Sequence, residues 1–188
     1  EAPSARSRSS RRGGKLESPP RRHLGPGGMN VAVEGFVIEV DDPRRDDVRA
    51  LLGRHLSFAR AVTPPEDVHA LDHDGLLDPA ITFFSLRAGD ELLGVGALKQ
   101  LDGEHVEIKS MHTATAARRR GVGRAMLDHL LAVASARGAR RVSLETGAGE
   151  EFAPARALYA GAGFVPCEPF GEYEPSRNST FMTRVLRR

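Results

Sequence analysis

Cysteine is nearly absent from this chain, and long apolar runs are missing altogether. The single cysteine, Cys167, cannot form an internal disulfide, which agrees with a reducing cytoplasm. A catalytic thiol needs a nearby base, and the surrounding sequence supplies none, so we expect Cys167 to be a packing residue. No stretch approaches the roughly 20 apolar residues that span a membrane. The sequence therefore predicts a cytoplasmic protein without a membrane partner.

Basic residues do not outnumber acidic ones once the first 28 residues are set aside. The whole chain has 27 Arg or Lys and 25 Asp or Glu, a net charge of +2. Residues 1–28 contain seven of the basic and two of the acidic side chains, so the remainder carries 20 basic and 23 acidic ones, a net charge of −3. A domain that binds nucleic acid is therefore not expected.

Large apolar side chains are almost missing from residues 1–28, which are rich in Ser, Arg, Pro and Gly. Such a segment cannot bury enough surface to offset the entropy of ordering its chain. We expect a disordered basic tail over residues 1–28, followed by one domain over residues 29–188. Residue 1 is not methionine, and Met29 is a candidate natural start, in which case the tail is not native. The alternative is a basic arm that contacts nucleic acid or anionic lipid.

Arginine and glycine are concentrated in one stretch, Arg118–Arg124. The preceding run, residues 105–113, alternates apolar and polar side chains and contains β-branched ones, which predicts a half-buried strand. After the stretch, apolar residues recur at three- and four-residue spacings from Val122 to Val133, which predicts a helix, and Gly138 is a typical helix stop. The predicted element is therefore strand, glycine-containing turn and helix.

This element suits the binding of an anion. The first turn of a helix has backbone N–H groups without partners and a partial positive charge. Gly121 and Gly123 let a ligand approach the backbone closely, and the arginines add charge, so we expect a cradle for a phosphate or pyrophosphate. A P-loop would need Lys and Ser or Thr after Gly123, and a dinucleotide fingerprint would need glycine in place of Met126, so both are disfavoured. The alternative is a basic turn that binds nothing.

Two segments resemble signatures of the GCN5-related N-acetyltransferase (GNAT) family. Residues 118–123, R-R-R-G-V-G, are similar to the Q/R-x-x-G-x-G/A signature, and residues 158–164 look like the later L-Y-x-x-x-G-F segment. Residues 107–111 and 152–156 look like an uncharacterised bacterial subgroup, and the resemblance covers residue 34 to the C-terminus. It implies an α/β fold with a mixed, mostly antiparallel sheet of six or seven strands flanked by helices.

The pattern of predicted strands and helices fits that fold. Strands are predicted over residues 36–40, 81–86, 92–101, 105–113, 141–145, 164–167 and 180–185. Short turns join the strands between residues 81 and 113, so these should be antiparallel, whereas residues 141–145 follow a helix and should lie parallel to residues 105–113. Asp42 and Pro43 predict a helix start, as N-cap and first helical residue. Pro154 opens a short helix.

The resemblance also implies acetyl-CoA as co-substrate. The cradle amides would bind its pyrophosphate, and the end of the strand before the cradle would pair with its pantetheine arm. The implied cofactor-binding residues are Met111, His112, Thr113, Arg118, Arg119, Arg120, Gly121, Val122, Gly123 and Arg124. One family contact is missing, because Phe152 stands where many members have an asparagine that contacts the cofactor.

No metal is expected. Histidine and aspartate crowd the segment 64–79, but their spacing fits no closed metal site. The residues concerned are His69, Asp72, His73, Asp74 and Asp78. The resemblance implies instead that this segment contacts the acceptor.

Acetyl transfer to an amine requires that the amine lose a proton, and the leaving thiolate benefits from gaining one. The resemblance implies Glu107 as the base, often acting through water, and Tyr159 as the acid. The alternatives are a strand glutamate that faces solvent and a tyrosine that only packs its ring. If Glu107 is not the base, His112 and a route through water alone are the next candidates.

Strand alternation would place Glu107, Lys109, Met111 and Thr113 on one face. Lys109 would then pair with Glu107 and weaken it as a base. Arg156 shares a helix face with Tyr159. Two cations, Lys109 and Arg156, near the reaction centre would favour an acceptor that carries a carboxylate over a polyamine.

We therefore predict an enzyme, an acetyl-CoA-dependent N-acetyltransferase that modifies the amine of a small molecule, as a monomer or homodimer. Two alternatives remain open. One is a sensor that binds acyl-CoA without catalysis, and the other is an enzyme that acetylates protein N-termini.

Deletion of residues 1–28 should leave the fold and the affinity for acetyl-CoA unchanged, because the segment has no core-forming residues. Thermal unfolding and acetyl-CoA titration of the full and shortened chains test this. A large drop in melting temperature or affinity would show that the tail belongs to the domain.

Overall fold

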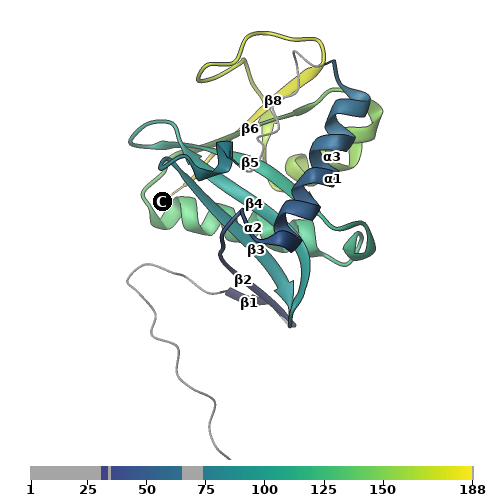
Figure 1. The fold of residues 1–188 in the computed structure, drawn as a ribbon. Coiled ribbons are helices and arrows are strands. Elements are labelled where there is room, and N and C mark those ends of the chain that lie inside the picture. Colours follow the sequence, from purple (N-terminus) through teal and green to yellow (C-terminus); the bar gives the residue numbers. More distant parts are fainter. Residues whose placement is uncertain (1–30, 34, 65–73, 188) are drawn as a thin grey trace, which may run out of the picture.

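Eight strands form a single mixed β-sheet (Figure 1). The structure is a computed structural model that describes residues 31–33, 35–64 and 74–187, so the predicted tail lies outside the described residues. The strands are β1 (Val31–Val33), β2 (Phe36–Val40), β3 (Ile81–Ala88), β4 (Glu91–Gln100), β5 (His105–Thr113), β6 (Arg141–Gly147), β7 (Val165–Pro166) and β8 (Ser179–Val185). Their order in the sheet is β1-β2-β3-β4-β5-β6-β8-β7.

Neighbouring strands are antiparallel except for β5 and β6, which are parallel. Tight turns join β3 to β4 and β4 to β5, whereas a helix connects β5 to β6, as a parallel pair requires. The predicted α/β fold with a mixed, mostly antiparallel sheet is therefore confirmed. The strands predicted from the sequence correspond to β2 through β8, and the structure adds β1 at the edge.

Helices cover both faces of the sheet (Figure 1). They are α1 (Asp46–Val62), α2 (Val122–Ala136) and α3 (Ala153–Gly161), with the short 3-10 helices η2 (Gly75–Leu77), η3 (Thr115–Ala117) and η4 (Glu150–Phe152). On one face, Val48 and Leu51 of α1 pack with Val95 and Ala97 of β4. On the other face, α2 buries Leu127 and its neighbours in the larger core. The apolar face predicted for the helix that follows the arginine–glycine stretch is therefore confirmed.

The start of α1 differs from the prediction. Asp42 is not the N-cap and Pro43 is not helical, because the helix begins at Asp46. The Asp42 carboxylate instead accepts a hydrogen bond from the backbone N of Arg44 at 2.9 Å and another from the Arg44 guanidinium at 2.7 Å. The bond from the backbone of Arg44 to the side chain of Asp42, two residues earlier, closes a turn. The Asp42 carboxylate is therefore engaged before the helix starts.

The other two predicted helix boundaries are confirmed. Gly138 directly follows the C-cap of α2 and has a φ of +85°, in the left-handed region that glycine adopts without strain. Pro154 lies in the first turn of α3, where its missing N–H leaves no helical hydrogen bond unmade.

A β-bulge interrupts β5 at Ser110. On β4, Val95 lies opposite His112 and Ala97 lies opposite Lys109, so two residues of β5 face the single Gly96 between them. Ser110 has a φ of +51°, which is unusual for a residue with a side chain. The extra residue reverses the alternation of side chains in the rest of the strand.

The prediction that four alternate residues of β5 share a face is therefore wrong for two of them. Lys109 lies opposite Ala97, on the α1 face, and Glu107 lies on that same face two residues earlier. Met111 packs against the core on the α2 face. Thr113 also lies on the α2 face. It lies opposite Gly94, and a Cβ at Gly94 would point to that face, where it would come within 3.0 Å of Val122 at the start of α2.

β5 and β6 separate as they run toward their carboxyl ends. Their parallel pairing extends from His105 and Arg141 to Ile108 and Leu144. Both strands continue beyond that point, but within the described strands they form no further ladder with each other. The backbone edge of the bulged half of β5 is therefore left unpaired beside β6.

The bulge gives a test of the backbone at Ser110. Ser110→Gly should raise the free energy of unfolding by about 1 kcal/mol, because it relieves the left-handed conformation and removes a buried hydroxyl for which the described residues provide no hydrogen bond. Ser110→Val should lower it, since a β-branched residue is strained at positive φ. Urea denaturation measures both changes. Equal destabilisation by the two substitutions would contradict this description of the bulge.

Candidate active site

A cleft with a volume of about 1210 Å³ opens between the diverging ends of β5 and β6. Its walls come from α1, β5, the turn before α2, β6, η4 and α3. The predicted site residues that line it are Glu107, Lys109, Met111, His112, Thr113, Arg118, Arg119, Gly121, Val122, Gly123, Arg124 and Tyr159. Pockets for drug-sized ligands usually measure about 300–1,000 Å³. The cleft thus has room for a large cofactor and a small second substrate.

The predicted cradle is the N-terminal end of α2. Gly121 is the N-cap with a φ of +81°, and Arg119 is also left-handed, with a φ of +60°. Such a turn directs successive backbone N–H groups into a concavity that suits an anion. The first turn of α2, which is fully described, contains no acidic side chain. A Cβ at Gly121 would meet no atom within 4 Å, so the space beside it is open.

The arginines of the cradle differ in their placement. Arg118, Arg119 and Arg124 line the cleft, whereas Arg120 is not among the lining residues. Arg124 also forms an ion pair of 2.8 Å with Asp128, one turn further along α2. Both side chains of this pair are about half exposed (53% and 52%), so the pair is weak enough to rearrange around a ligand.

Glu107 lies in a buried polar cluster at the other end of the cleft. Its side chain is only 3% exposed and forms an ion pair of 3.1 Å with Lys109, as the sequence predicted. A third member, Tyr173, was not predicted. Its hydroxyl lies 2.5 Å from Oε1 of Glu107 and 2.6 Å from Nζ of Lys109. No local sequence pattern indicates this contact, because Tyr173 lies 66 residues from Glu107 in an irregular segment.

Tyr159 is buried in α3 and lines the same cleft as Glu107. Its ring packs edge-on against Phe164, with 5.9 Å between centroids. Burial, with a further contribution from the charge of Glu145, raises the pKa of Tyr159 well above that of an exposed tyrosine. The hydroxyl therefore keeps its proton throughout the physiological pH range.

Two histidines that face each other also line the cleft. The rings of His55 on α1 and His112 on β5 have centroids 4.6 Å apart. Burial lowers the pKa of both rings, and the nearby His55, Arg118 and Arg54 contribute further to His112, whose pKa falls to about 3. Both imidazoles are therefore neutral at neutral pH, and His112 is a weak base.

The part of the cleft that holds Glu107 carries a second carboxylate, which was not predicted from the sequence. Glu145 of β6 lines the cleft, and its charge raises the pKa of both Tyr159 and Tyr173. Its position could have been predicted. Glu107 pairs with Ser143 across the two parallel strands, so Glu145, two residues further along, faces the same side.

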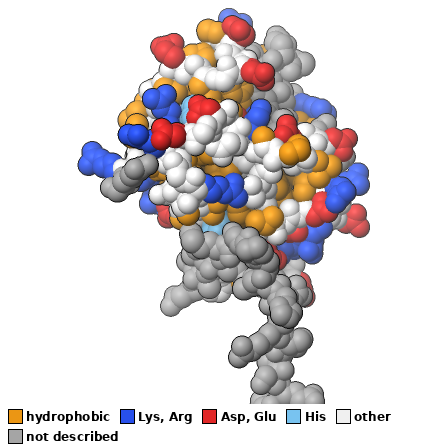
Figure 2. Space-filling model, turned by 90° about the vertical axis from the view of Figure 1, so that its left-hand side faces the viewer, with side chains coloured by type: hydrophobic (Ala, Val, Ile, Leu, Met, Phe, Trp, Pro, Cys, Tyr) orange, Lys and Arg blue, Asp and Glu red, His pale blue; other side chains and the backbone are white. Residues whose placement is uncertain are grey.

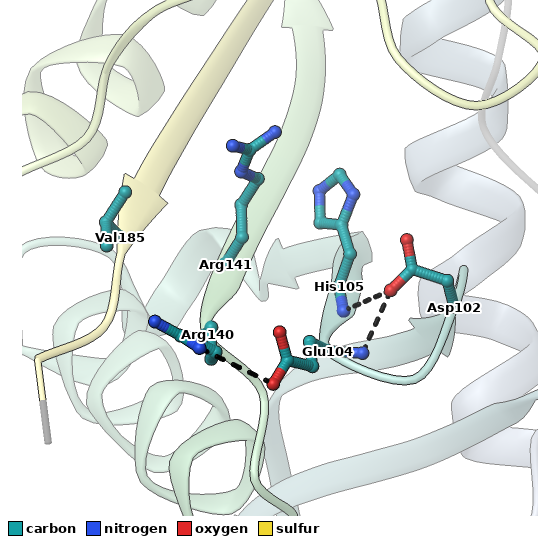
Figure 3. Close-up of a pocket in the computed structure, with 6 residues that line it drawn as sticks. All are labelled: Asp102, Glu104, His105, Arg140, Arg141 and Val185. Carbon is teal, nitrogen blue, oxygen red and sulfur yellow. Dashed lines mark hydrogen bonds and ion pairs between the residues drawn. The ribbon is translucent and has the colours of Figure 1, made fainter.

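A smaller hollow of about 350 Å³ lies at the opposite end of β5 (Figure 3). It is lined by Asp102, Glu104, His105, Arg140, Arg141 and Val185. The acidic and basic side chains are already engaged in part, because Glu104 pairs with Arg140 at 3.8 Å and Asp102 accepts bonds from the backbone of Glu104 and His105. This hollow contains none of the predicted site residues.

Comparison with known proteins now decides the family. The acetyltransferase (GNAT) family matches residues 46–164. This chain belongs to the GNAT family. It is 47% identical to the uncharacterized N-acetyltransferase YsnE of Bacillus subtilis (strain 168), over 79% of this chain and 99% of that protein. It is 44% identical to the uncharacterized N-acetyltransferase YedL of Escherichia coli (strain K12), over 80% and 95% of the two chains.

A solved structure supports the fold independently. The acetyltransferase of Bacillus subtilis in complex with CoA superposes with a TM-score of 0.61 and 21% identity, covering 80% of this chain and 98% of that chain. The predicted family and the predicted acyltransferase activity are therefore confirmed.

In this GNAT enzyme, Arg156 does not reach the cleft, contrary to the prediction. Its guanidinium donates hydrogen bonds to the carbonyl oxygens of Gly147 at 2.8 Å and Gly149 at 2.7 Å. It therefore fixes the loop between β6 and η4. Sharing a helix face with Tyr159 did not decide where the long side chain ends, because its guanidinium bonds to these loop carbonyls.

Phe152, which replaces the family's asparagine, lines the cleft of the GNAT enzyme at this loop. Its ring lies over Gly147, where a Cβ would come within 2.3 Å of the ring, and contacts Phe58 of α1 edge-on at 5.5 Å. At the position where many family members have an asparagine, Phe152 therefore forms an aromatic wall between two sides of the cleft.

In the described part of the chain, no group of three or more His, Cys, Asp or Glu side chains is placed to hold a metal ion. Most of the segment predicted to contact the acceptor, including His69, Asp72 and His73, lies outside the described residues. No helix of the described ranges is long and apolar enough to cross a membrane. The face in Figure 2 shows basic and acidic side chains interspersed, unlike a continuous basic surface for nucleic acid.

Acetyl-CoA should raise the melting temperature of this GNAT enzyme progressively with its concentration. Gly121→Val and Gly123→Val should each lower the apparent affinity for acetyl-CoA at least tenfold, because a side chain would block the approach of a phosphate to the backbone. The shift in melting temperature at a given acetyl-CoA concentration should shrink accordingly. Differential scanning fluorimetry measures both effects.

Gly138→Val is the matched control for the cradle variants. Gly138 ends the same helix, has a φ of +85° and, like Gly121, would place its Cβ within 4 Å of no other atom. Its substitution should cost similar stability and leave the acetyl-CoA shift intact. Normal binding by both folded cradle variants would contradict the assigned site.

Proposed function

We propose that this enzyme transfers an acetyl group from acetyl-CoA to the amine of a small molecule. One observation carries the proposal: the anion cradle, Glu107 and Tyr159 all line a single cleft. An acyl-CoA has a pyrophosphate at one end and a thioester at the other. The cleft provides a cationic end and an end with titratable groups, in the order that such a ligand requires.

The cofactor would lie along the unpaired edge of β5. The backbone N–H groups of residues 119–124 would bind the pyrophosphate, with charge from Arg118 and Arg119. Residues 111–113 would pair with the pantetheine arm as with an added strand. The bulge supports this placement, because it leaves this part of β5 beside the space where β6 has diverged.

Glu107 would then accept a proton from the acceptor ammonium, directly or through a water molecule. The free amine attacks the thioester carbonyl carbon, the attacking nitrogen releases its second proton to solvent, and the tetrahedral intermediate collapses by breaking the C–S bond. Tyr159 would donate a proton to the departing sulfur and recover one afterwards from solvent or from Glu107. The raised pKa of Tyr159 suits a group that must hold its proton until the thiolate forms.

The pairing of Glu107 with Lys109 limits its strength as a base but does not block it. The described hydrogen bonds from Lys109 and Tyr173 reach the same oxygen, Oε1. The second oxygen, Oε2, forms no hydrogen bond within the described residues. Since Glu107 lines the cleft, this oxygen is the one that can take the proton. His112 is the weaker candidate because its pKa is so low.

The acceptor is proposed only as a small amine. A carboxylate-bearing acceptor was expected from two cations, but Arg156 binds loop carbonyls and Lys109 is paired with Glu107. Glu145 adds negative charge at the same end of the cleft. These placements give no support to a preference for amino acids over polyamines.

Two other functions are distinguished by turnover. An acyl-CoA sensor would bind acetyl-CoA without releasing CoA in the presence of any amine, and an N-terminal acetyltransferase would prefer peptides to small amines. A panel of amino acids, diamines, arylalkylamines and short peptides, followed by detection of the free thiol, separates these cases. Release of CoA with a small amine, above the rate of spontaneous hydrolysis, is the expected result.

The two catalytic roles predict different pH–rate profiles. Glu107→Gln should lower kcat/KM for the acceptor by roughly 10²-fold, and the loss should shrink as pH rises because more of the free amine is then deprotonated without help. Tyr159→Phe should slow thiolate departure with acetyl-CoA binding largely intact, and high pH should not restore it. Wild-type activity of Glu107→Gln at neutral pH would place the base elsewhere. Full recovery of Tyr159→Phe at high pH would exclude a general acid.

A further inference from the structure

Tyr173 lies in the segment between β7 and β8, residues 167–178, which the mechanism above does not use. The match to the family stops at residue 164, before this segment begins. The segment nevertheless returns to the catalytic end of the sheet. The hydroxyl of Tyr173 contacts both Glu107 and Lys109, from 66 and 64 residues away in the sequence.

The hydrogen bonds of the cluster have definite directions. Lys109 has only donors on Nζ, so it donates to the Tyr173 oxygen at 2.6 Å and to Oε1 of Glu107 at 3.1 Å. The Tyr173 hydroxyl uses its own proton to donate to Oε1 of Glu107. Burial, and then the charge of Glu107 and this hydrogen bond, raise the pKa of Tyr173, so the hydroxyl remains a donor at neutral pH.

The ring of Tyr173 is held on two sides by aromatic residues. Its centroid lies 5.2 Å from that of Phe170 in the same segment and 5.4 Å from that of Phe181 in β8. Phe181 is buried, so this support belongs to the sheet itself. Lys109 Nζ also lies 5.2 Å from the centroid of the Tyr173 ring. The hydroxyl is therefore presented to Glu107 from a fixed ring.

We propose that Tyr173 is a positioning residue for catalysis, which with Lys109 fixes Oε1 of Glu107 and thereby leaves Oε2 toward the acceptor amine. This inference rests on the proposed role of Glu107 as the base. Two donors on one oxygen restrict rotation of the carboxylate about its last bond. They also stabilise its ionised form, which is the form that can accept a proton.

Other titratable groups face this cluster from the elements packed around it. They are Lys99 on β4, opposite Glu107, His105 and His112 on β5, His55 on α1 and Glu145 on β6. A substitution at Tyr173 leaves all of these residues in place, although Glu145 also interacts with the Tyr173 hydroxyl. The control variant and the double variant described below therefore separate the bond between Tyr173 and Glu107 from the other contributions.

Tyr173→Phe is the direct test, because it removes the hydroxyl and keeps the ring. In pH–rate profiles, kcat/KM for the acceptor should fall about tenfold at neutral pH. The acidic limb, where activity is lost as the base takes up a proton, should move to higher pH, since the carboxylate loses a donor that favoured its ionised form. The affinity for acetyl-CoA should not change. Lys109→Met removes the other donor to Oε1 of Glu107 and should therefore move the acidic limb in the same direction. It is the substitute test if Tyr173→Phe does not fold.

Ser176→Ala is the matched control, because it also removes one hydroxyl from the segment 167–178. The Ser176 hydroxyl accepts a bond from the backbone N of Asn178 at 3.0 Å and is not part of the Glu107 cluster. Its profile should coincide with that of the wild type. If Tyr173→Phe has the wild-type profile, or if Ser176→Ala shifts the limb equally, the proposal is wrong.

The double variant Glu107→Gln with Tyr173→Phe distinguishes the positioning role of Tyr173 from the proposed role of Glu107 as the base. If Tyr173 acts through Glu107, then Tyr173→Phe should lower kcat/KM for the acceptor by less than a further twofold in the Glu107→Gln background. A full additional tenfold loss would overturn the positioning role. Full activity of Glu107→Gln would instead refute the proposed base, and with it any role for Tyr173 through that base.

Discussion

The separation of β5 from β6 is the feature on which the rest of the site depends. The two strands are neighbours through Ile108 and Leu144 and then diverge, while the bulge at Ser110 turns the end of β5. Without this separation, the backbone N–H and C=O groups of residues 111–113 would form hydrogen bonds with β6. The left-handed Ser110 is the local strain that accompanies the opening. A closed sheet would have the same helices and core but no cleft.

The cleft that results is chemically divided along its length. One end is the N-terminus of α2, where unpaired N–H groups, Arg118 and Arg119 create a positive potential. The other end holds Glu107, Glu145 and the buried pair with Lys109. Glu107 and Lys109, whose side chains are 3% and 10% exposed, interact strongly with each other because they are shielded from water, whereas Arg118 and Arg119 are exposed to solvent. In the proposed mechanism, this division would orient an elongated anionic cofactor and leave proton transfer to the end that holds Glu107.

Local sequence signals predicted most of the fold and the cradle, because strand alternation, helix periodicity and turn glycines act within about ten residues. The prediction failed where contacts between distant segments decide the outcome. One extra residue at the bulge moved Met111 and Thr113 to the other face, and no local pattern around Ser110 indicates it. Arg156 was misplaced because a helix position does not fix the end of a long side chain. Tyr173 was missed because nothing near it in the sequence points to Glu107.

The position of acetyl-CoA in the cleft is tested most directly by hydrogen–deuterium exchange with and without the cofactor. Slower exchange on binding should concentrate in residues 111–113 and in residues 119–124, whose N–H groups would bond the pantetheine arm and the pyrophosphate. The hollow at the start of β5, with residues 102–105, should exchange at the same rate in both states. Protection at that hollow, with none at the cradle, would contradict the assignment of the active site.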